Sequence, residues 1–191
     1  MFDHVTLRAA DLTASRAFYE TVLGVLGLES THDEWEDLSL MPAGAGETAT
    51  TGLHIGFSAA SPAVVDAFWQ AGVDAGYASD GKPGRRPEYG EDYYGGFLLD
   101  PDGNSVEAVH HDTRRADGFL DHLWIRVADL EASRAFHELV GRFAGFGVDS
   151  VRGELVQFKP GERPGYHAGY YGAYVLDPDG HNVELVDHHR D

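Results

Sequence analysis

Hydrophobic and polar side chains alternate along residues 2–9, so that Val5 and Leu7 lie on one face of an extended chain and His4 lies on the other. This alternation predicts a strand with one buried face. Apolar residues then recur at helical spacing from residue 12 to about residue 23, directly after Asp11, a residue type that caps helices. The chain therefore begins with a strand followed by an amphipathic helix.

The pattern of strand and helix begins again at residue 53. Before that point, residues 28–35 and 37–41 are predicted to form two further strands, and a loop rich in Gly, Ala and Thr covers residues 42–52. The later predicted elements are a strand over residues 53–58, a helix over residues 63–71, and strands over residues 77–81, 94–99 and 105–110. A tight turn is predicted between the last two of these strands.

The chain also repeats itself at two different offsets. Residues 3–19 match residues 121–137 at 11 of 17 positions, an offset of 118, and residues 82–107 match residues 159–184 at 16 of 26 positions, an offset of 77. Because the offsets differ by 41 residues, the second copy lacks the middle of the first. The predicted organisation is a complete two-unit domain at residues 1–112, a linker at residues 113–118 and a partial second copy at residues 119–191.

The composition excludes several classes of protein. The chain of 191 residues has no cysteine, so any metal must be held by His, Asp or Glu. A net charge of −18 argues against nucleic acid as a partner, because phosphate binding needs clustered Lys and Arg. No apolar run approaches the ~18 residues of a membrane span, and no signal segment opens the chain. We therefore expect a soluble, cytoplasmic protein that contacts no membrane.

Three potential metal ligands share one face of the predicted strands. His4, His54 and Glu107 each lie opposite the apolar row of their own strand. If the apolar rows pack under the helices, two imidazoles and one carboxylate converge on the other side of the sheet. Such a set leaves coordination positions open for a substrate and suits Fe²⁺, Mn²⁺ or Zn²⁺. His4 and His54 also occupy the same position in two equivalent units.

Four segments of the chain carry a family resemblance. They are Phe2-Asp3-His4-Val5, the helix end Ala17-Phe18-Tyr19 before Leu26-Gly27-Leu28, the strand Gly52-Leu53-His54-Ile55-Gly56-Phe57, and Leu99-Asp100-Pro101-Asp102-Gly103-Asn104-Ser105-Val106-Glu107. Together they resemble the vicinal oxygen chelate superfamily of glyoxalase I, extradiol dioxygenases, fosfomycin-modifying enzymes and bleomycin-resistance proteins. The resemblance implies an α+β fold in which paired βαβββ modules form a cupped mixed sheet, with a third βαβββ module at the C-terminus.

The resemblance also implies a function. It suggests a divalent-metal-dependent enzyme that acts on a small oxygenated substrate chelated to the metal. The first unit offers no clear fourth ligand, since Ser39 occupies the matching face and Glu47 lies in a loop. Three ligands favour a site like that of the extradiol dioxygenases, with Fe²⁺ or Mn²⁺, or like that of the fosfomycin-modifying enzymes. The preferred prediction is an extradiol-dioxygenase-like reaction, while a glyoxalase-like lyase or isomerase reaction with Zn²⁺ or Ni²⁺ stays open. The alternative is a non-catalytic protein of the bleomycin-resistance type that sequesters a small molecule.

The second copy keeps two of the three ligand positions, as His122 and Glu184, and has lost the counterpart of His54. Two such copies meeting across a twofold axis would combine two His and two Glu, so we hypothesise a homodimer through the C-terminal module. The net charge of residues 113–191 is −4, against −14 for residues 1–112, which favours self-association of the C-terminal part. A degenerate module that only packs against the first domain is the alternative.

Further candidate residues surround the expected site. Tyr89, Tyr93 and Tyr94 precede the penultimate strand of the first copy, where a phenol can transfer a proton or contact the substrate. Packing at the rim of the site is the other interpretation of these tyrosines. Arg8 shares a face with His4 and offers a cation to an anionic substrate group. Other cations that can serve in this way are Arg85, Arg86 and Arg126, and solvation at the surface is the alternative interpretation of all four arginines.

Overall fold

The computed structural model divides the chain into two compact units. The described residues are 4–31, 33–35, 37–112, 118–152, 155–160 and 169–189. One unit spans residues 2–126 and the other spans residues 127–191. The boundary follows Arg126, beyond the first predicted strand of the C-terminal copy. Of the predicted linker, residues 113–117 lie outside the described residues.

The first repeat unit comprises β1 (Val5–Ala9), α1 (Leu12–Val25), β2 (Glu34–Trp35) and β3 (Leu38–Pro42). Asp11 caps α1 as predicted, because its carboxylate accepts a hydrogen bond of 3.1 Å from the Ala14 backbone N–H. The strand predicted over residues 28–35 is wrong in length, since only β2 is a strand among its described residues. Positive φ angles at Gly27 and Asp33 interrupt the extended backbone there. The three strands form a sheet of order β1-β3-β2.

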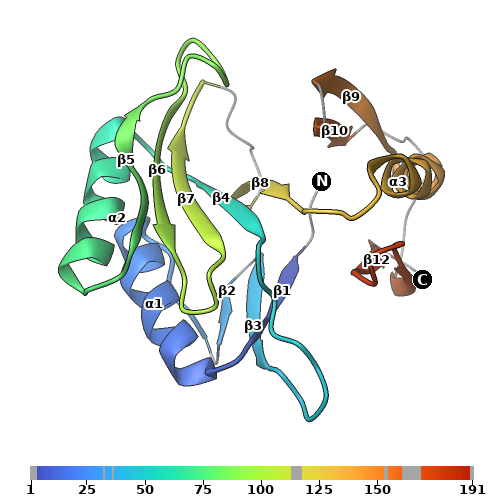
Figure 1. Ribbon diagram of the computed structural model, residues 1–191, viewed down its shortest axis with the longest axis horizontal. Coiled ribbons are helices and arrows are strands. Elements are labelled where there is room, and N and C mark those ends of the chain that lie inside the picture. Colours follow the sequence, from blue (N-terminus) through green and yellow to red (C-terminus); the bar gives the residue numbers. More distant parts are fainter. Residues whose placement is uncertain are drawn as a thin grey trace. The chain divides into compact units, whose positions relative to one another are not determined.

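The second repeat unit contributes four strands to a five-stranded sheet. Its elements are β4 (His54–Ser58), α2 (Pro62–Asp74), β5 (Ser79–Arg85), β6 (Tyr94–Leu99) and β7 (Ser105–His110), and the fifth strand is β8 (Leu120–Trp124). The order is β5-β6-β7-β4-β8, in which β4 runs parallel to β7 and antiparallel to β8 (Figure 1). The expected α+β class with mixed sheets is confirmed. The strand predicted to open the C-terminal copy, β8, thus pairs with the second unit.

The apolar rows of these strands form the core, as their alternation predicts. Ile55 of β4, Val106 of β7 and Leu98 of β6 are fully buried, on the face against which α2 packs. Figure 1 shows α1 and α2 side by side, and Phe18 and Phe68 extend from them into the same core. Each fully buried side chain of this size contributes about 1.5–3 kcal/mol to stability. The other face of the sheet is therefore left to the alternate residues of the same strands.

The predicted tight turn between β6 and β7 is present. Asp100 accepts backbone hydrogen bonds from Asp102 at 2.9 Å and Asn104 at 2.8 Å, and Gly103 has a φ of 84°. Tyr19 of α1 donates a hydrogen bond of 3.0 Å to the same carboxylate. Burial and the negative charge of Asp100 raise the pKa of the Tyr19 phenol, which stays a neutral donor. The turn is thereby fixed to the helix beneath it.

Asp37 ties the first repeat unit to the start of β8. Its carboxylate accepts backbone hydrogen bonds from Phe119 at 2.8 Å and Leu120 at 3.2 Å, and the residue is only 5% exposed. Gly118 precedes these residues with a φ of 70°, and a Cβ there would overlap the Asp37 carboxylate. Asp37 therefore fixes the position at which β8 begins.

Replacing Asp37 by alanine is expected to lower the free energy of unfolding by about 2–4 kcal/mol, because two buried backbone N–H groups lose their acceptor. Asp37→Asn keeps a carbonyl oxygen and is the matched control, with an expected loss of about half as much or less. Urea unfolding followed by circular dichroism measures both variants. Unchanged stability of Asp37→Ala would show that the start of β8 does not depend on this carboxylate.

The C-terminal unit contains α3 (Leu130–Ala144), β9 (Phe146–Arg152), β10 (Leu155–Pro160), β11 (Gly169–Leu176) and β12 (Asn182–His189). Its strands form two antiparallel pairs, β9 with β10 and β11 with β12. The third βαβββ module stays a prediction, because these four strands do not join one sheet within the described residues. None of the helices described is both long enough and apolar enough to span a membrane.

Candidate metal centre

The register of three adjacent strands brings polar side chains together over one glycine. Gly56 of β4 is paired with Glu107 of β7 on one side and with His122 of β8 on the other. Paired residues of neighbouring strands point to the same face, so Glu107 and His122 flank Gly56 on the polar face. His54 precedes Gly56 by two residues and points to that face as well. Because Gly56 has no side chain, the space above it is left for the other three.

These three side chains each bring one potential ligand atom to a common point. His54 Nε2 lies 3.1 Å from Glu107 Oε2 and 3.0 Å from His122 Nε2. His122 Nε2 lies 3.3 Å from Glu107 Oε2. Within the described residues, this is the one group of three or more His, Asp or Glu whose ligand atoms lie within 4.8 Å of one another. Glu107 is 1% exposed, and a carboxylate so buried needs cationic or hydrogen-bonding partners.

The triangle of ligand atoms has dimensions that fit a divalent cation. With ligand bonds of about 2.1 Å, ligand atoms lie about 3.0 Å apart at octahedral angles and about 3.4 Å apart at tetrahedral angles. The observed separations of 3.0, 3.1 and 3.3 Å fall within this range. Two imidazoles and one carboxylate suit Fe²⁺, Mn²⁺, Zn²⁺ or Ni²⁺ and leave coordination positions open. The residues present therefore fit the metal that the sequence predicts.

Each imidazole is oriented through its other ring nitrogen. His54 Nδ1 lies 3.0 Å from Ser105 Oγ, and His122 Nδ1 lies 2.9 Å from Asp121 Oδ1. The second oxygen of Asp121 lies 2.8 Å from His111 Nε2. Partners of this kind fix the ring orientation and the tautomer of metal-ligating histidines. Both Nε2 atoms are thereby presented to the third ligand.

The electrostatics of the three side chains support the same arrangement. Burial alone would raise the pKa of Glu107, but hydrogen bonds from His122 and His54 bring it below its usual value. Burial disfavours a charged His122 too, yet Asp121 and Glu107 raise the pKa of His122 to about 9. Tyr93 donates hydrogen bonds of 2.9 and 3.1 Å to the two Glu107 oxygens, and burial raises the pKa of its phenol. The site thus keeps Glu107 ionised and Tyr93 neutral.

Known proteins share this architecture. The sequence profile of the Glyoxalase/Bleomycin resistance protein/Dioxygenase superfamily matches residues 1–108, more than half of the chain. The chain belongs to this superfamily. It is similar to a solved glyoxalase/bleomycin resistance protein from Albidiferax ferrireducens, with 32% identity over 59% of this chain and 99% of that chain and a TM-score of 0.50. It also resembles a lactoylglutathione lyase from Agrobacterium tumefaciens, with 24% identity over 58% of this chain and 92% of that chain and a TM-score of 0.44. No curated protein matches the chain.

The match to the superfamily contains two of the three clustered residues. His54 and Glu107 lie inside residues 1–108, whereas His122 lies beyond them on β8. The expected partner from the sequence, His4, is exposed and directly precedes β1, which pairs with β3. A strand has two hydrogen-bonding edges, and those of β4 are occupied by β7 and β8. His122 rather than His4 therefore completes the cluster in the structure.

The two residues of the expected second partial site belong to different units of this superfamily member. His122 lies in the five-stranded sheet, where it joins His54 and Glu107. Glu184 lies on β12 of the C-terminal unit, in register with Tyr174 of β11. A homodimer through the C-terminal module stays a prediction.

The three predicted catalytic tyrosines have different surroundings. Tyr93 contacts the Glu107 carboxylate, as described above. Tyr89 packs edge-on against Trp124, with ring centroids 5.9 Å apart. Tyr94 instead donates a hydrogen bond of 2.8 Å to Asp66 of α2. Tyr93 and Tyr89 are thus the tyrosines that the structure places at the candidate centre.

Two glycines and one aspartate of the site have roles that sequence reasoning missed. A Cβ at Gly56 would overlap the ring of His122, and a Cβ at Gly95 would overlap the Glu107 carboxylate. Close approach of a ligand side chain, not a special backbone conformation, therefore explains glycine at both positions. Asp121 orients His122, and the repeated Asp-His pair that includes it was the available signal.

A cavity of about 420 Å³ opens beside the cluster. His54 and Glu107 lie in its wall. The rest of the wall includes the aliphatic side chains of Leu53 and Leu99 and six aromatic or charged side chains, which are Tyr89, Phe97, Trp124, Asp80, Arg86 and Arg126. Arg8, another predicted catalytic residue, lies on β1 and forms an ion pair of 3.3 Å with Glu47. The arginines that line the cavity are therefore Arg86 and Arg126.

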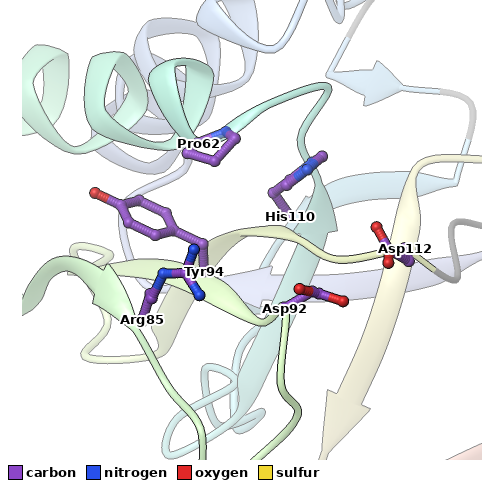
Figure 2. Close-up of a pocket in the computed structure, with 6 residues that line it drawn as sticks. All are labelled: Pro62, Arg85, Asp92, Tyr94, His110 and Asp112. Carbon is purple, nitrogen blue, oxygen red and sulfur yellow. The ribbon is translucent and has the colours of Figure 1, made fainter.

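A smaller cavity of about 170 Å³ lies at the start of α2. Figure 2 shows the six side chains that line it, which are Pro62, Arg85, Asp92, Tyr94, His110 and Asp112. Four of these side chains have partners within the protein: His110 Nδ1 lies 3.1 Å from the Ala59 carbonyl, Tyr94 binds Asp66, and a hydrogen bond with Asp112 raises the pKa of Asp92. We therefore take the larger cavity, beside the three ligand atoms, as the candidate site.

Asp121→Asn is expected to weaken Zn²⁺ binding about tenfold, because carboxylates that orient metal-ligating histidines are worth about 10–100-fold in affinity. The variant keeps the size of the side chain and loses its charge. Asp66→Asn, which changes a carboxylate that binds Tyr94 instead, is the matched control. Calorimetric titration with Zn²⁺ measures both, and equal affinities would contradict an orienting role for Asp121.

Proposed function

We propose that this superfamily member is a divalent-metal-dependent enzyme that acts on a small oxygenated molecule chelated to the metal. His54, His122 and Glu107 hold the cation. The observation that carries the proposal is the triangle of ligand atoms, with edges of 3.0–3.3 Å, beside a cavity of about 420 Å³. Pockets of this size accept a small molecule and bury most of its surface.

The number of ligands favours extradiol-dioxygenase-like chemistry over glyoxalase-like chemistry. Within the described residues, no fourth His, Asp or Glu joins the cluster. Glu47, the weak fourth candidate from the sequence, is paired with Arg8. Two histidines and one carboxylate with open positions are typical of non-haem Fe(II) oxygenases. Cleavage of an oxygenated ring by dioxygen is therefore the reaction that we propose first.

When bound, the cation acts as a Lewis acid on the chelated substrate oxygens. The residues of the chain position it and the substrate. Tyr93 holds both oxygens of Glu107, and Asp121 holds the ring of His122. Trp124 and Phe97 give the cavity apolar walls against which a substrate can pack.

Tyr89 is the side chain to which we assign proton transfer with the substrate. It lines the cavity, and at 46% exposure its phenol can exchange a proton with solvent. Its ring rests against Tyr93 and Trp124, with centroid separations of 5.3 and 5.9 Å. These contacts hold the ring of Tyr89 in the wall of the cavity.

Oxygen consumption tests the proposed reaction. Metal-free protein is loaded under nitrogen with Fe²⁺, Mn²⁺ or Zn²⁺, and oxygen uptake is then followed with a panel of catechols. We expect uptake with Fe²⁺ or Mn²⁺ and none with Zn²⁺, which does not change its oxidation state. His54→Ala, which removes one ligand, is expected to show no uptake with any of the three.

Two other results would identify a different function. Conversion of methylglyoxal and glutathione under nitrogen by the Zn²⁺ or Ni²⁺ form, without oxygen uptake, would indicate a glyoxalase-like lyase. Absence of bound metal in both the unsubstituted protein and His54→Ala would refute the enzyme proposal. The bleomycin-resistance type of sequestering protein would then be the better interpretation, since a net charge of −18 favours cationic ligands.

A further inference from the structure

Aromatic side chains form much of the wall of the larger cavity. Trp124 lies 4.9 Å from the His54 ring and 5.9 Å from Tyr89, measured between ring centroids. Phe97 lies 5.9 Å from the His54 ring on its other side. Trp124 is 38% exposed, so much of this large side chain is available to a ligand. Such walls favour a flat ring that stacks on them or meets them edge-on.

Two arginines of the same cavity have no carboxylate partner among the described residues. The Arg86 guanidinium donates hydrogen bonds to the carbonyls of Arg85 at 3.1 Å and Lys82 at 2.8 Å, and it lies 5.4 Å from the Phe97 ring centroid. Arg126 is exposed and forms no ion pair within the described part of the chain. The chain has 14 Lys and Arg against 32 Asp and Glu, so unpaired arginines at one cavity concentrate positive charge there.

The acidic residues of the cavity do not cancel this charge. Glu107 is buried, and its hydrogen bonds join it to Tyr93, His54 and His122. A divalent cation in the cluster more than offsets its charge. Asp80 is the other acidic residue of the lining, and its single negative charge is outnumbered by the two positive charges of Arg86 and Arg126. A metal-loaded cavity therefore keeps a positive balance, in a protein that is strongly negative elsewhere.

Comparison of the two copies shows that a ligand histidine, an aromatic wall and an arginine occur together only at β8 and the residues after it. His122, Trp124 and Arg126 occupy alternate positions of β8 and the residues that follow it. In the first copy, a threonine stands in the place of Trp124, and the corresponding arginine, Arg8, is neutralised by Glu47 at 3.3 Å. The aromatic wall and the available cation accompany the ligand histidine only in the copy that lines the cavity.

We propose that the cavity binds a flat aromatic molecule that carries one carboxylate. Its ring lies against Trp124 and Phe97, and its carboxylate interacts with Arg86 and Arg126. This inference rests on the proposed function in one respect, which is that oxygens at the other end of the ring face the metal. The arginines and the aromatic walls are properties of the chain itself.

Binding of two matched probes tests this substrate class. The probes are 3,4-dihydroxybenzoate and its neutral analogue 3,4-dihydroxybenzamide, titrated under nitrogen into Zn²⁺-loaded and metal-free protein, with tryptophan fluorescence and calorimetry as readouts. We expect the acid to bind the Zn²⁺ form about tenfold more tightly than the amide, since a hydrogen bond between an arginine and a carboxylate is stronger than one to a neutral amide. Arg126→Gln is expected to remove most of this preference. Arg8→Gln, the matched control from the first copy, is expected to keep it.

The outcomes separate this inference from the proposed function. If Zn²⁺ binds but the acid and the amide bind equally, or if the preference persists in a double Arg86→Gln, Arg126→Gln variant, the inference is overturned and the metal site stands. If Zn²⁺ does not bind but the metal-free protein still prefers the acid, the inference stands and the enzyme proposal fails. Quenching of fluorescence that survives Trp124→Phe would also overturn the inference, because the ring would then lie elsewhere.

Discussion

Replacing His122 by alanine is expected to lower the affinity for Zn²⁺ by about a hundredfold or more, which corresponds to about 2.7 kcal/mol. His122 Nε2 is one of three ligand atoms separated by 3.0–3.3 Å, and its loss leaves one imidazole and one carboxylate. It also leaves the buried Glu107 with one hydrogen-bonding partner fewer. Calorimetric titration of metal-free protein measures the change.

His4→Ala is the control for this experiment, because His4 occupies the same position in the first copy of the repeat. Its affinity for Zn²⁺ is expected to stay within about threefold of the unsubstituted protein, a difference below 1 kcal/mol. A loss of affinity in His4→Ala with none in His122→Ala would show that His4, next to β1, and not His122 of β8 is the third ligand. The strand pairing of β4 described above would then be incorrect in solution.

Gly56→Ala is expected to weaken Zn²⁺ binding by about ten- to a hundredfold, although it removes no ligand. Substitution of residues that position metal ligands typically lowers affinity by this amount. A Cβ at this position would overlap three atoms of the His122 ring. The ring cannot move aside without cost, because Asp121 holds its Nδ1 at 2.9 Å. His122 Nε2 would therefore move away from the other two ligand atoms.

Gly24→Ala is the matched control for the glycine variant. Gly24 lies in α1, and a Cβ there meets no atom within 4 Å. Alanine at this position is expected to leave Zn²⁺ affinity unchanged and to stabilise the helix by about 0.5–1 kcal/mol. Full Zn²⁺ affinity in Gly56→Ala would mean that the His122 ring does not lie over Gly56.

Much of the fold could be predicted from local patterns. The alternation in β4 and β7 placed His54 and Glu107 on the face opposite the core, and the structure brings their ligand atoms to 3.1 Å. The tight turn with Asp100 and the cap at Asp11 were predictable because each depends on residues that are near in sequence. Periodicity and capping are local properties, so one sequence is enough to read them.

The third ligand was not predictable in this way. His4 and His122 share the same Asp-His pair and the same alternation, so no local signal separates them. What separates them is whether β1 or β8 pairs with β4, a choice made by backbone hydrogen bonds between distant residues. Asp37 contributes to that choice from 82 residues away, through its bond to Phe119.

The tyrosine that faces the site was also not predictable from the sequence, even though the candidates are neighbours in the chain. Tyr93 and Tyr94 are adjacent, so their side chains point in different directions, one to Glu107 and the other to Asp66. The sequence marked both as candidates, because it does not show which of them faces the site. That depends on the register of β6 on β7, where Tyr94 pairs with His110.

The central claim is that His54, Glu107 and His122 form one metal site. The most direct measurement is the anomalous X-ray signal of zinc in crystals of the full chain grown with Zn²⁺. The account predicts one strong peak about 2.0–2.2 Å from His54 Nε2, His122 Nε2 and a Glu107 oxygen. A peak bound by His4 together with His54 and Glu107, or no peak at these residues in zinc-saturated crystals, would contradict it.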